Sequence, residues 1–434
     1  MTVDIVLLTR DLRLHDNPSL AAAATDQVVP LYVLDPAAQR SEFRSRFLAD
    51  CLHDLDDALR KRGSRLVIRR GDTVDQVGRV AEQVGAATVH LAADASSFAR
   101  RRERRLAAEL GGQRRELRLH PGVHTVVEPG AVVPSGSDHY AVYTPYWRRW
   151  SEQPYRPQAA VPHRLSTPEV VSEALPERDP LDGFAGGETA GRARLTRWLS
   201  HGLAEYGEQR DILAANGTSR LSAYLHFGCL SATEVTTRAA ERGAAAEDFL
   251  RQLAWRDFHY QLLARDPRLA WRDYRPRPAG LPSPGPAGGD AVPAWRDGLT
   301  GYPLVDAGMR QLLGEGWMHN RARMVTASFL TKTLGVPWQG GAAHFFRYLL
   351  DGDIANNALN WQWVAGTGTD SRPNRRLSAV RQGERFDADG EYVRRWVPEL
   401  SDVPARYVHQ PWRLPDADRP GDYPPPIVEP PSSR

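Results

Sequence analysis

The sequence predicts an α/β domain built on a doubly wound parallel sheet, joined by a long connector to an all-α domain. Three observations carry this prediction. Residues 1–120 alternate short apolar runs with amphipathic stretches, residues 121–187 are rich in proline, and residues 188–412 show helical periodicity. A chain of 434 residues also suits two or three domains. We place the boundaries at 1–128, 129–187 and 188–412, followed by a proline-rich, disordered tail at 413–434.

The first 120 residues supply the sheet domain. Strands are expected at Val3–Leu8, Val28–Leu34, Arg65–Ile68, Thr88–Ala92 and Leu117–Leu119. Helices are expected between them at Pro18–Ala24, Phe43–Arg62, Val74–Val84 and Phe98–Leu110. A capping box from Thr73 to Gln76 opens the third helix. The alternation implies right-handed crossovers and a Rossmann-like sheet, but the GxGxxG fingerprint is missing, which disfavours dinucleotide binding.

Later segments predict the connector and the helical domain. Within the connector, Tyr140–Trp147 is too aromatic for a free linker and is expected to pack. Residues 276–293 read as a Pro/Gly loop. The expected helices are one capped by Ser231, then Glu247–Arg265, a helix from Pro303 through Leu313, Asn320–Leu334 and Gly340–Leu350.

Composition excludes several classes of protein. Hydrophobic residues make up 41% and charged residues 25%, and no apolar run approaches the ~18 residues of a membrane span. The N-terminus lacks the apolar stretch of a secretory signal. The two cysteines, Cys51 and Cys229, cannot build a disulfide framework, and neither lies in a CxxC motif. We therefore expect a cytoplasmic protein without a metal site.

Charge by itself points to no partner. The net charge is +3, and almost all basic residues are arginines, Lys61 and Lys332 being the lysines. A biased genome explains this arginine content as well as phosphate binding does. The run Arg100–Arg105 could contact a polyanion, but a solvated helix face is the favoured interpretation. The 12 tryptophans, most of them beyond residue 190, require a large helical core or an aromatic function.

Three groups of polar and aromatic residues lie in the expected helical domain. Thr218–Ser222 places three hydroxyls and a guanidinium before a helix, which suits a pyrophosphate, although a plain helix N-cap is favoured on the motif alone. Asp351–Trp363 holds two acids, three asparagines and two tryptophans, the partners that a flavin would need. Gln252, Trp255 and His259 share a helix face that lines a pocket, meets a stacked base, or forms an amphipathic border.

Together with further motifs, these residues resemble the DNA photolyase/cryptochrome family. The motifs are Leu8–Arg13, Tyr206 with Arg210, Thr218–Ser222, Trp255–Phe258, Thr300–Ala307, Gly316–Arg321 and Asp351–Trp363. The resemblance runs from Leu8 to about Trp412, and it is most similar to class I cyclobutane-dimer enzymes of actinobacterial type. The block from 300 to 363 is highly specific, because several motifs occur in order at the family's spacing.

The resemblance implies an N-terminal α/β domain and a helical domain that binds FAD. It also implies light-driven repair of cyclobutane pyrimidine dimers, in which reduced FAD gives an electron to a lesion flipped out of the DNA. The residues that match FAD contacts are Tyr206, Thr218, Ser219, Arg220, Leu221, Ser222, Gln252, Arg256, Arg323, Asp351, Asp353 and Asn357. Among them, Asp351 is expected to pair with Arg323, and Asn357 matches the residue that faces the flavin N5.

The resemblance also assigns electron-transfer and DNA-binding residues. Trp361, Trp338 and Trp295 match the chain that passes an electron from the surface to photoexcited flavin. The residues that match positions near DNA or the lesion are Arg210, Gln252, Trp255, His259, Asn320, Arg321, Met324, Trp363 and Gln382. Of these, Arg210 and Arg321 would hold phosphates, and Trp255 and Trp363 would form the walls of the lesion pocket.

Two departures from the family pattern affect the lesion site. Gln252 stands where many cyclobutane-dimer enzymes carry a Glu, and Leu377–Val380 replaces a Phe-Asn-Pro type of segment. Enzymes for (6-4) products place histidines where this chain has Asn320 and Met324, which favours the cyclobutane dimer, whereas Gln252 favours the (6-4) product.

Three functions therefore remain open: cyclobutane-dimer repair, (6-4) repair, and blue-light sensing as a cryptochrome. The residues after Trp412 lack a helical pattern, which weakens the photoreceptor alternative. We expect a monomer that acts on UV-damaged single- or double-stranded DNA and contacts no membrane. The resemblance also implies an antenna chromophore in the α/β domain, with an 8-hydroxy-5-deazaflavin preferred and methenyltetrahydrofolate as the alternative.

Overall fold

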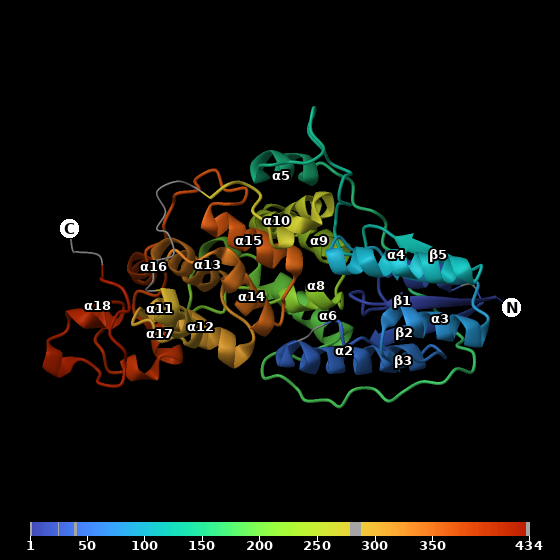
Figure 1. Cartoon of the computed structure of the whole chain (residues 1–434), viewed down its shortest axis with the longest axis horizontal. Coiled ribbons are helices and arrows are strands. Elements are labelled where there is room, and N and C mark those ends of the chain that lie inside the picture. The colour runs from blue at the N-terminus through green and yellow to red at the C-terminus, as the bar shows by residue number, and fades with distance from the viewer. Residues whose placement is uncertain (1, 25, 39–40, 278–287, 431–434) are drawn as a thin grey trace. The chain divides into compact units, whose positions relative to one another are not determined.

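The computed structural model describes residues 2–24, 26–38, 41–277 and 288–430. The chain forms two compact units, which are described separately (Figure 1). Unit 1 comprises Met1–Ala204 and Ser219–Ala270, and unit 2 comprises Glu205–Thr218 and Trp271–Arg434. The domain boundaries expected at 128, 187 and 412 remain a prediction.

Unit 1 contains a five-stranded parallel sheet, as predicted. Its strands are β1 (Val3–Leu8), β2 (Gln27–Leu34), β3 (Val67–Arg70), β4 (Thr88–Ala92) and β5 (Glu116–His120). Their order is β3-β2-β1-β4-β5, and every pair is parallel. The order reverses at β1, which is the mark of a doubly wound sheet. The predicted fold class, an α/β domain followed by a helical region, is confirmed.

Helices cover the sheet because both faces of its central strands are apolar. The covering helices are α1 (Pro18–Ala23), α2 (Glu42–Arg60), α3 (Thr73–Val84) and α4 (Ser97–Gly112). In the register, Ile5 of β1 lies beside Val29 of β2 and Val89 of β4, and all three pack in one core with residues of α3 and α4. Val6, on the opposite face of β1, is also fully buried.

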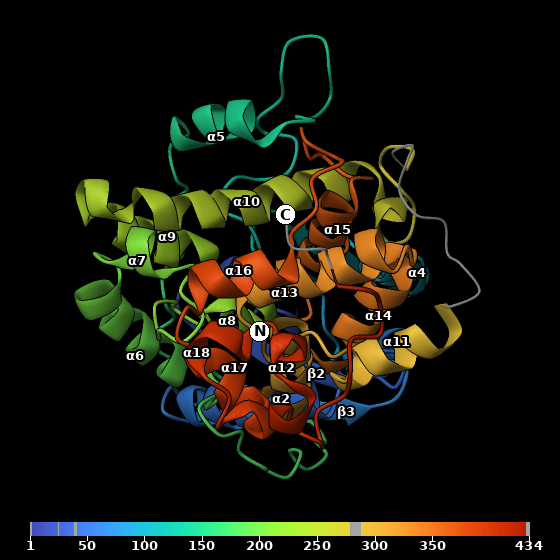
Figure 2. The ribbon, with the colours of Figure 1, turned by 90° about the vertical axis from the view of Figure 1, so that its left-hand side faces the viewer.

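The remainder of unit 1 consists of helices and of the largely irregular segments 121–142 and 152–187. Its elements are α5 (Tyr143–Ser151), α6 (Glu188–Arg197) with a π-helical turn at Trp198–Gly202, α8 (Ser222–Phe227), α9 (Ala232–Ala240), a 3₁₀ turn at Gly243–Ala246, α10 (Glu247–Arg265) and a 3₁₀ turn at Pro267–Ala270. Helix α5 lies along α10 (Figure 2). The aromatic segment of the connector therefore packs, as expected, and it does so as a helix with Tyr146 and Trp150 buried.

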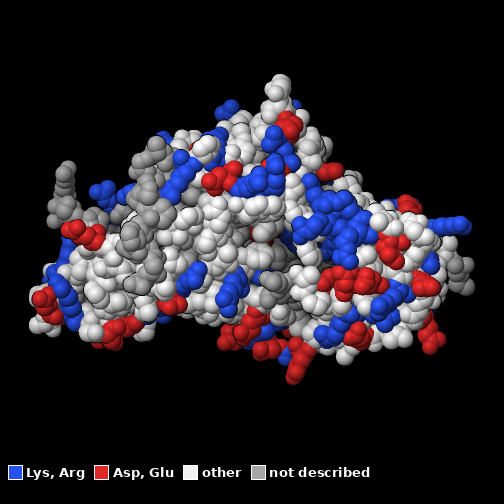
Figure 3. All heavy atoms as spheres, viewed as in Figure 1, with Lys and Arg blue, Asp and Glu red and all other residues white. Residues whose placement is uncertain are grey.

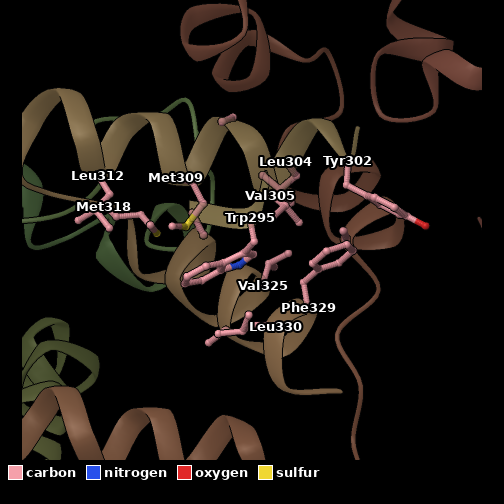
Figure 4. Close-up of a cluster of buried hydrophobic side chains, with 14 of the residues drawn as sticks. Trp295, Tyr302, Leu304, Val305, Met309, Leu312, Met318, Val325, Phe329 and Leu330 are labelled. Carbon is pink, nitrogen blue, oxygen red and sulfur yellow. The ribbon is translucent and has the colours of Figure 1, made fainter. Parts of the chain in front are cut away.

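The regular elements in the described part of unit 2 are all helical, and loops connect them. Its elements are α7 (Tyr206–Gln209), α11 (Gly288–Asp297), α12 (Pro303–Glu315), α13 (Asn320–Ser328) with a π-helical turn at Phe329–Thr333, α14 (Trp338–Tyr348), α15 (Ile354–Ala365), α16 (Ala379–Phe386), α17 (Glu391–Trp396), α18 (Ala405–Val408), and 3₁₀ turns at Pro398–Leu400, Pro411–Arg413 and Asp416–Asp418. Trp295 lies at the centre of its core, beside Met309, Val325 and Leu330 (Figure 4).

Several expected boundaries are wrong for local reasons. The capping box from Thr73 does not form, because Asp72 caps α3 and the Thr73 hydroxyl donates to Asp35 instead. Strand β3 begins at Val67 rather than Arg65, since the Leu66 amide donates to the Asp56 side chain. The long helix expected from Asn320 is α-helical only to Ser328, and the helix expected from Gly340 begins at Trp338.

Two other expectations concern loops. The Pro/Gly loop at 276–293 falls largely outside the described residues, although α11 already begins at Gly288. The tail expected to be disordered is packed as far as the structure describes it. Tyr423 is buried and donates a hydrogen bond to Asp306 Oδ2 at 2.6 Å, and the Ile427 amide donates to the Thr300 carbonyl at 2.9 Å. The expectation of disorder is therefore wrong for this part of the tail, and residues 431–434 lie outside the described part.

Two further findings concern the cysteines and the apolar character of the helices. Cys51 and Cys229 are both buried free thiols, and their Sγ atoms lie 3.3 Å apart. Among the described residues, no helix has both the length and the apolar character that a membrane crossing requires.

Two glycines provide a matched test of packing in unit 1. Gly228 and Gly85 end α8 and α3 with φ angles of +69° and +62°. A Cβ at Gly228 would lie 1.8 Å from the Arg10 carbonyl oxygen, whereas a Cβ at Gly85 meets nothing within 4 Å. Gly85→Ala should lower the free energy of unfolding by about 1 kcal/mol. Gly228→Ala should lower it by about 3 kcal/mol or more. Urea unfolding measures both, and equal losses would contradict the close approach.

Candidate functional site

In unit 2, the polar segment Asp351–Trp363 begins in the turn between α14 and α15. Helix α14 ends at Tyr348 because Leu349 is extended, and Leu349 and Leu350 are buried. Asp353 is also buried and caps α15, where its Oδ1 accepts from the amide and from the side chain of Asn356, each at 2.8 Å. The turn is therefore packed into unit 2 and is not an exposed surface loop. The carboxylate of Asp353 fixes where α15 begins.

Asp351 forms the ion pair that the resemblance implies. Both guanidinium nitrogens of Arg323 donate to the two carboxylate oxygens, at 3.1 and 3.0 Å. The Nε of Arg323 donates to the Met318 carbonyl at 2.8 Å, and the Asp351 side chain is only 5% exposed. A paired fork of this kind holds both side chains in one geometry. The pair joins α13 to the turn before α15.

Asn357 follows Asp353 by one helical turn. Its Nδ2 donates to the Ala342 carbonyl of α14 at 2.8 Å, which fixes the orientation of the amide. Its Oδ1 accepts no hydrogen bond from any described residue, although the side chain is half-buried. A flavin ring carries donors and acceptors along its edge. An oriented amide with a free acceptor beside two buried carboxylates fits such a group.

The three tryptophans assigned to electron transfer share one core in unit 2. The rings of Trp361 and Trp295 are 6.1 Å apart and nearly perpendicular. Trp338, on α14, donates from Nε1 to Asp273 at 2.6 Å. Trp295 donates to the Thr326 carbonyl at 3.0 Å and is 1% exposed. The expectation that this set begins at the surface is therefore wrong for Trp295, which lies in the interior (Figure 4).

Arg210, Arg321 and Gln382, the expected phosphate and DNA contacts, lie in unit 2. Arg321 of α13 donates to Gln382 Oε1 of α16 at 3.3 Å, so the structure brings these two together. It also pairs with Asp211 at 2.7 Å. Arg210 lies over the ring of Tyr206, at the other end of α7. Sequence reasoning missed Asp211, which partly neutralises the charge of Arg321; its only signal is its place next to Arg210.

Three residues expected near the lesion lie on two helices of unit 2, α13 and α15. Asn320 and Met324 are one turn apart on α13, and the Asn320 amide lies 3.9 Å from the Met324 sulfur. Asn320 is exposed and Met324 is half-buried. Trp363, at the end of α15, is half-buried and lies 5.1 Å from the guanidinium carbon of Arg375.

The hydroxyl-rich segment Thr218–Ser222 leads into α8, with Thr218 in unit 2 and Ser219, Arg220, Leu221 and Ser222 in unit 1. The favoured interpretation as a plain helix N-cap is wrong, since Leu221 occupies the cap position and no side chain caps α8. The Ser219 hydroxyl instead accepts from the Leu221 amide at 3.4 Å. Arg220 has a φ of +50°, an uncommon conformation for a residue with a side chain.

The helix face formed by Gln252, Trp255 and His259 runs from solvent into the core of unit 1. Gln252 is exposed, Trp255 is half-buried and His259 is buried. The ring of Tyr143, in α5, stacks on Trp255 with centroids 3.8 Å apart and planes 8° apart. The Tyr143 hydroxyl donates to the Arg251 carbonyl at 2.7 Å. One face of Trp255 is therefore already covered, a contact whose only sequence signal was the aromatic content of the connector.

Arg256 and Asp257 follow Trp255 on α10, and Asp257 points away from the face that Gln252, Trp255 and His259 share. The Arg256 guanidinium donates to the His124 carbonyl and lies 4.7 Å from the Tyr260 ring centroid. Asp257 is fully buried, and its Oδ2 accepts from the amides of Val126 and Val127 and from the indole of Trp150, each at 2.9 Å. Burial raises the pKa of Asp257 to about 6. Asp257 lies within the motif Trp255–Phe258, but the sequence alone assigned it no role.

The arginine run of α4 faces two ways. Arg102 is half-buried, and Arg105 pairs with Asp72 at 2.9 Å, so the interpretation as one solvated face is incomplete. The other arginines of the run, together with residues 265–268, line a hollow of about 540 Å³ within the basic patch of Figure 3. Its lining residues are Ser97, Arg100, Arg101, Arg104, Asp138, Arg265, Asp266, Pro267 and Arg268. Such a surface attracts anionic groups.

Comparisons with known proteins cover nearly the whole chain. Residues 4–166 match a family model described as DNA photolyase, and residues 249–434 match one described as FAD binding domain of DNA photolyase. A protein of Streptomyces griseus named deoxyribodipyrimidine photo-lyase is 54% identical over 99% of this chain and 97% of its own length. A protein of the same name from Escherichia coli is 37% identical over 99% and 96%.

Solved structures agree in fold. A bacterial class III photolyase from Agrobacterium tumefaciens superimposes with a TM-score of 0.90 and 33% identity, covering 99% of this chain and 95% of that one. A cryptochrome from Synechocystis superimposes with a TM-score of 0.92 and 29% identity, covering 99% and 97%.

The buried Asp257 predicts a pH dependence of stability. Its pKa of about 6 lies above the ordinary value of 3.8, so between these pH values the folded protein binds more protons than the unfolded chain. This residue therefore makes the free energy of unfolding fall as the pH rises from 4 to 6, by up to about 3 kcal/mol. Asp257→Asn keeps an acceptor oxygen and removes the charge, so the fall should be shallower in urea unfolding. Asp57→Asn, at an exposed position of α2, is the control. An unchanged slope in Asp257→Asn would contradict the assignment.

Proposed function

This chain belongs to the DNA photolyase family, and we propose that it repairs cyclobutane pyrimidine dimers in DNA with the energy of blue light, using bound FAD. The observation that carries the proposal is the 54% identity, over nearly the full length, to a protein named deoxyribodipyrimidine photo-lyase. The match of residues 249–434 to an FAD-binding domain supports the cofactor.

When bound and reduced, FAD supplies an electron to the dimer and takes it back once the ring has opened. Asp351, Asp353 and Asn357 lie beside the flavin ring in this proposal, Arg323 holds Asp351 in place, and Gln252 and Arg256 contribute from α10. The bidentate pair and the free Oδ1 of Asn357 support this role. The residues proposed to hold the phosphates and ribose are Tyr206, Thr218, Ser219, Arg220, Leu221 and Ser222.

Damaged DNA is the proposed macromolecular substrate. A lesion must leave the duplex to be read by side chains, and weak pairing at a dimer lowers the cost. Arg210, Arg321 and Gln382 bind the backbone in this proposal, and the contact between Arg321 and Gln382 supports their acting together. The side chains proposed to surround the lesion are Gln252, Trp255, His259, Asn320, Met324 and Trp363.

Two alternatives keep a specific observation in their favour. The likeness to the Synechocystis cryptochrome favours a photoreceptor, and Gln252 favours (6-4) repair. The antenna remains a prediction, an 8-hydroxy-5-deazaflavin before methenyltetrahydrofolate, and chromatography of the pigments released by denaturation identifies it. The monomeric state and the cytoplasmic location also stay predictions.

The proposed function is tested by repair in light and darkness. Purified protein should carry about one FAD per chain, because the segment Asp351–Trp363 offers hydrogen-bond partners for the edge of a flavin ring. With reduced FAD, blue light should restore an oligonucleotide that contains one thymine dimer, and a dark sample should not. Protein that stays without flavin absorbance after reconstitution would refute the proposal. Protein that binds FAD and repairs no lesion would favour the photoreceptor alternative.

Trp361 is expected to matter for photoreduction and not for repair. Its indole lies 4.9 Å from Phe345 and 6.1 Å from Trp295, and Phe in its place keeps an aromatic ring but is far harder to oxidise. Trp361→Phe should abolish the light-driven reduction of oxidised FAD, while chemically reduced protein should retain repair within about twofold. Trp396→Phe is the control. Photoreduction of Trp361→Phe at the wild-type rate would show that another residue is the donor.

Lesion choice depends on Asn320, Met324 and Gln252. Neither side chain of the pair on α13 titrates near neutral pH, so these two positions offer no imidazole for the proton transfer of (6-4) repair. We expect repair of cyclobutane dimers in single- and double-stranded DNA and none of (6-4) products. Gln252→Glu should retain or raise repair, because it restores a charged acceptor. Product analysis by chromatography checks both, and repair of (6-4) products alone would reverse the assignment.

A further inference from the structure

The electron donors proposed above do not end at the protein surface. Trp361, Trp338 and Trp295 are 3%, 3% and 1% exposed. A buried indole that has lost an electron must be re-reduced through another group, since a reductant in solution cannot reach it. The proposed photoreduction therefore requires a further redox-active side chain that lies near one of these indoles and closer to solvent.

A line of ring contacts leads outward from Trp295. The His344 ring lies 5.5 Å from Trp295, and the Tyr348 ring lies 5.0 Å from His344. His344 and Tyr348 are one turn apart on α14, so their side chains are neighbours on the helix surface. Tyr348 is half-buried, whereas Trp295 is enclosed. The contacts thus join the buried indole to a phenol that reaches solvent.

His344 suits its place between the two rings. Burial and the nearby arginines 296 and 347 lower its pKa to about 4, so the imidazole is neutral at pH 7. A neutral ring adds no positive charge beside an indole that is losing an electron. The described residues supply no hydrogen-bond partner for its buried Nε2.

Trp271 is the competing exit, and its geometry is weaker. It is 49% exposed, and its carbonyl accepts from Gln339, the neighbour of Trp338. Asp273, two residues further on, accepts from Trp338 Nε1 at 2.6 Å. Its indole, however, contacts no aromatic ring of the described residues. The chain of ring contacts favours Tyr348.

We propose that Tyr348 is the terminal electron donor of this chain, supplying Trp295 from the surface. The inference rests on the proposed function, in which Trp361 would give an electron to bound, photoexcited FAD and Trp295 would re-reduce Trp361. Tyr348 then gives one electron to oxidised Trp295 and releases its phenolic proton to water, which leaves a neutral tyrosyl radical and a restored indole. A thiol in solution reduces that radical by donating one hydrogen atom.

The test compares Tyr348→Phe with Trp271→Phe in FAD-loaded protein. Phe keeps the ring contact with His344 but has no phenolic proton to lose. After a flash without thiol, electron paramagnetic resonance should show a tyrosyl radical in the wild type and in Trp271→Phe. In Tyr348→Phe it should show a tryptophanyl radical instead, with recombination several-fold faster by transient absorption. Repair by chemically reduced protein and thermal unfolding should be unchanged, which separates electron supply from folding.

Three other outcomes of this experiment would overturn the inference. An unchanged radical in Tyr348→Phe together with its loss in Trp271→Phe would overturn the inference and assign the exit to Trp271. A tyrosyl radical that persists in Tyr348→Phe would also overturn it and point to another tyrosine. Wild-type protein that binds FAD and gives no amino-acid radical would refute the proposed role of Trp361, and the inference with it.

Discussion

The arrangement of unit 1 around α10 depends on the carboxylate of Asp257. Its Oδ2 joins two segments that are more than 100 residues away in sequence, accepting from Val126, Val127 and Trp150. Each of these donors would otherwise be buried without a partner, at a cost of about 1–3 kcal/mol apiece. Trp255 and Arg256 occupy the same stretch of α10. The carboxylate that holds the fold therefore also sets the positions of candidate site residues.

Unit 2 uses buried acids in the same way. Asp353 caps α15 and determines where that helix starts, and Asp351 ties the turn before it to Arg323 of α13. Asp353, Asn357 and Trp361 are four residues apart and therefore share one helix face. A shift of the cap by one residue would turn this face by about 100°. The spacing of the acids thus matters as much as their charge.

Much of the fold could be predicted because its signal is local. Strands β1 and β4 match their predicted limits, since both are apolar and buried on each side. The polar edge strand β3 lacks that pattern and was displaced by two residues. The order of the tail could not be predicted, because Tyr423 meets Asp306 across 117 residues.

The candidate site likewise contains contacts that the sequence could predict and contacts that it could not. Motif resemblance anticipated the ion pair of Arg323 with Asp351. The contacts of Tyr143 with Trp255 and of Asp211 with Arg321 arise from tertiary packing and leave no motif.

The two buried thiols of unit 1 have a practical consequence for labelling the protein. Because Cys51 and Cys229 are the only cysteines and both are buried, one cysteine introduced on the surface would be the only accessible thiol. A dye or spin label can thus be attached at a chosen helix while the native cysteines stay in place.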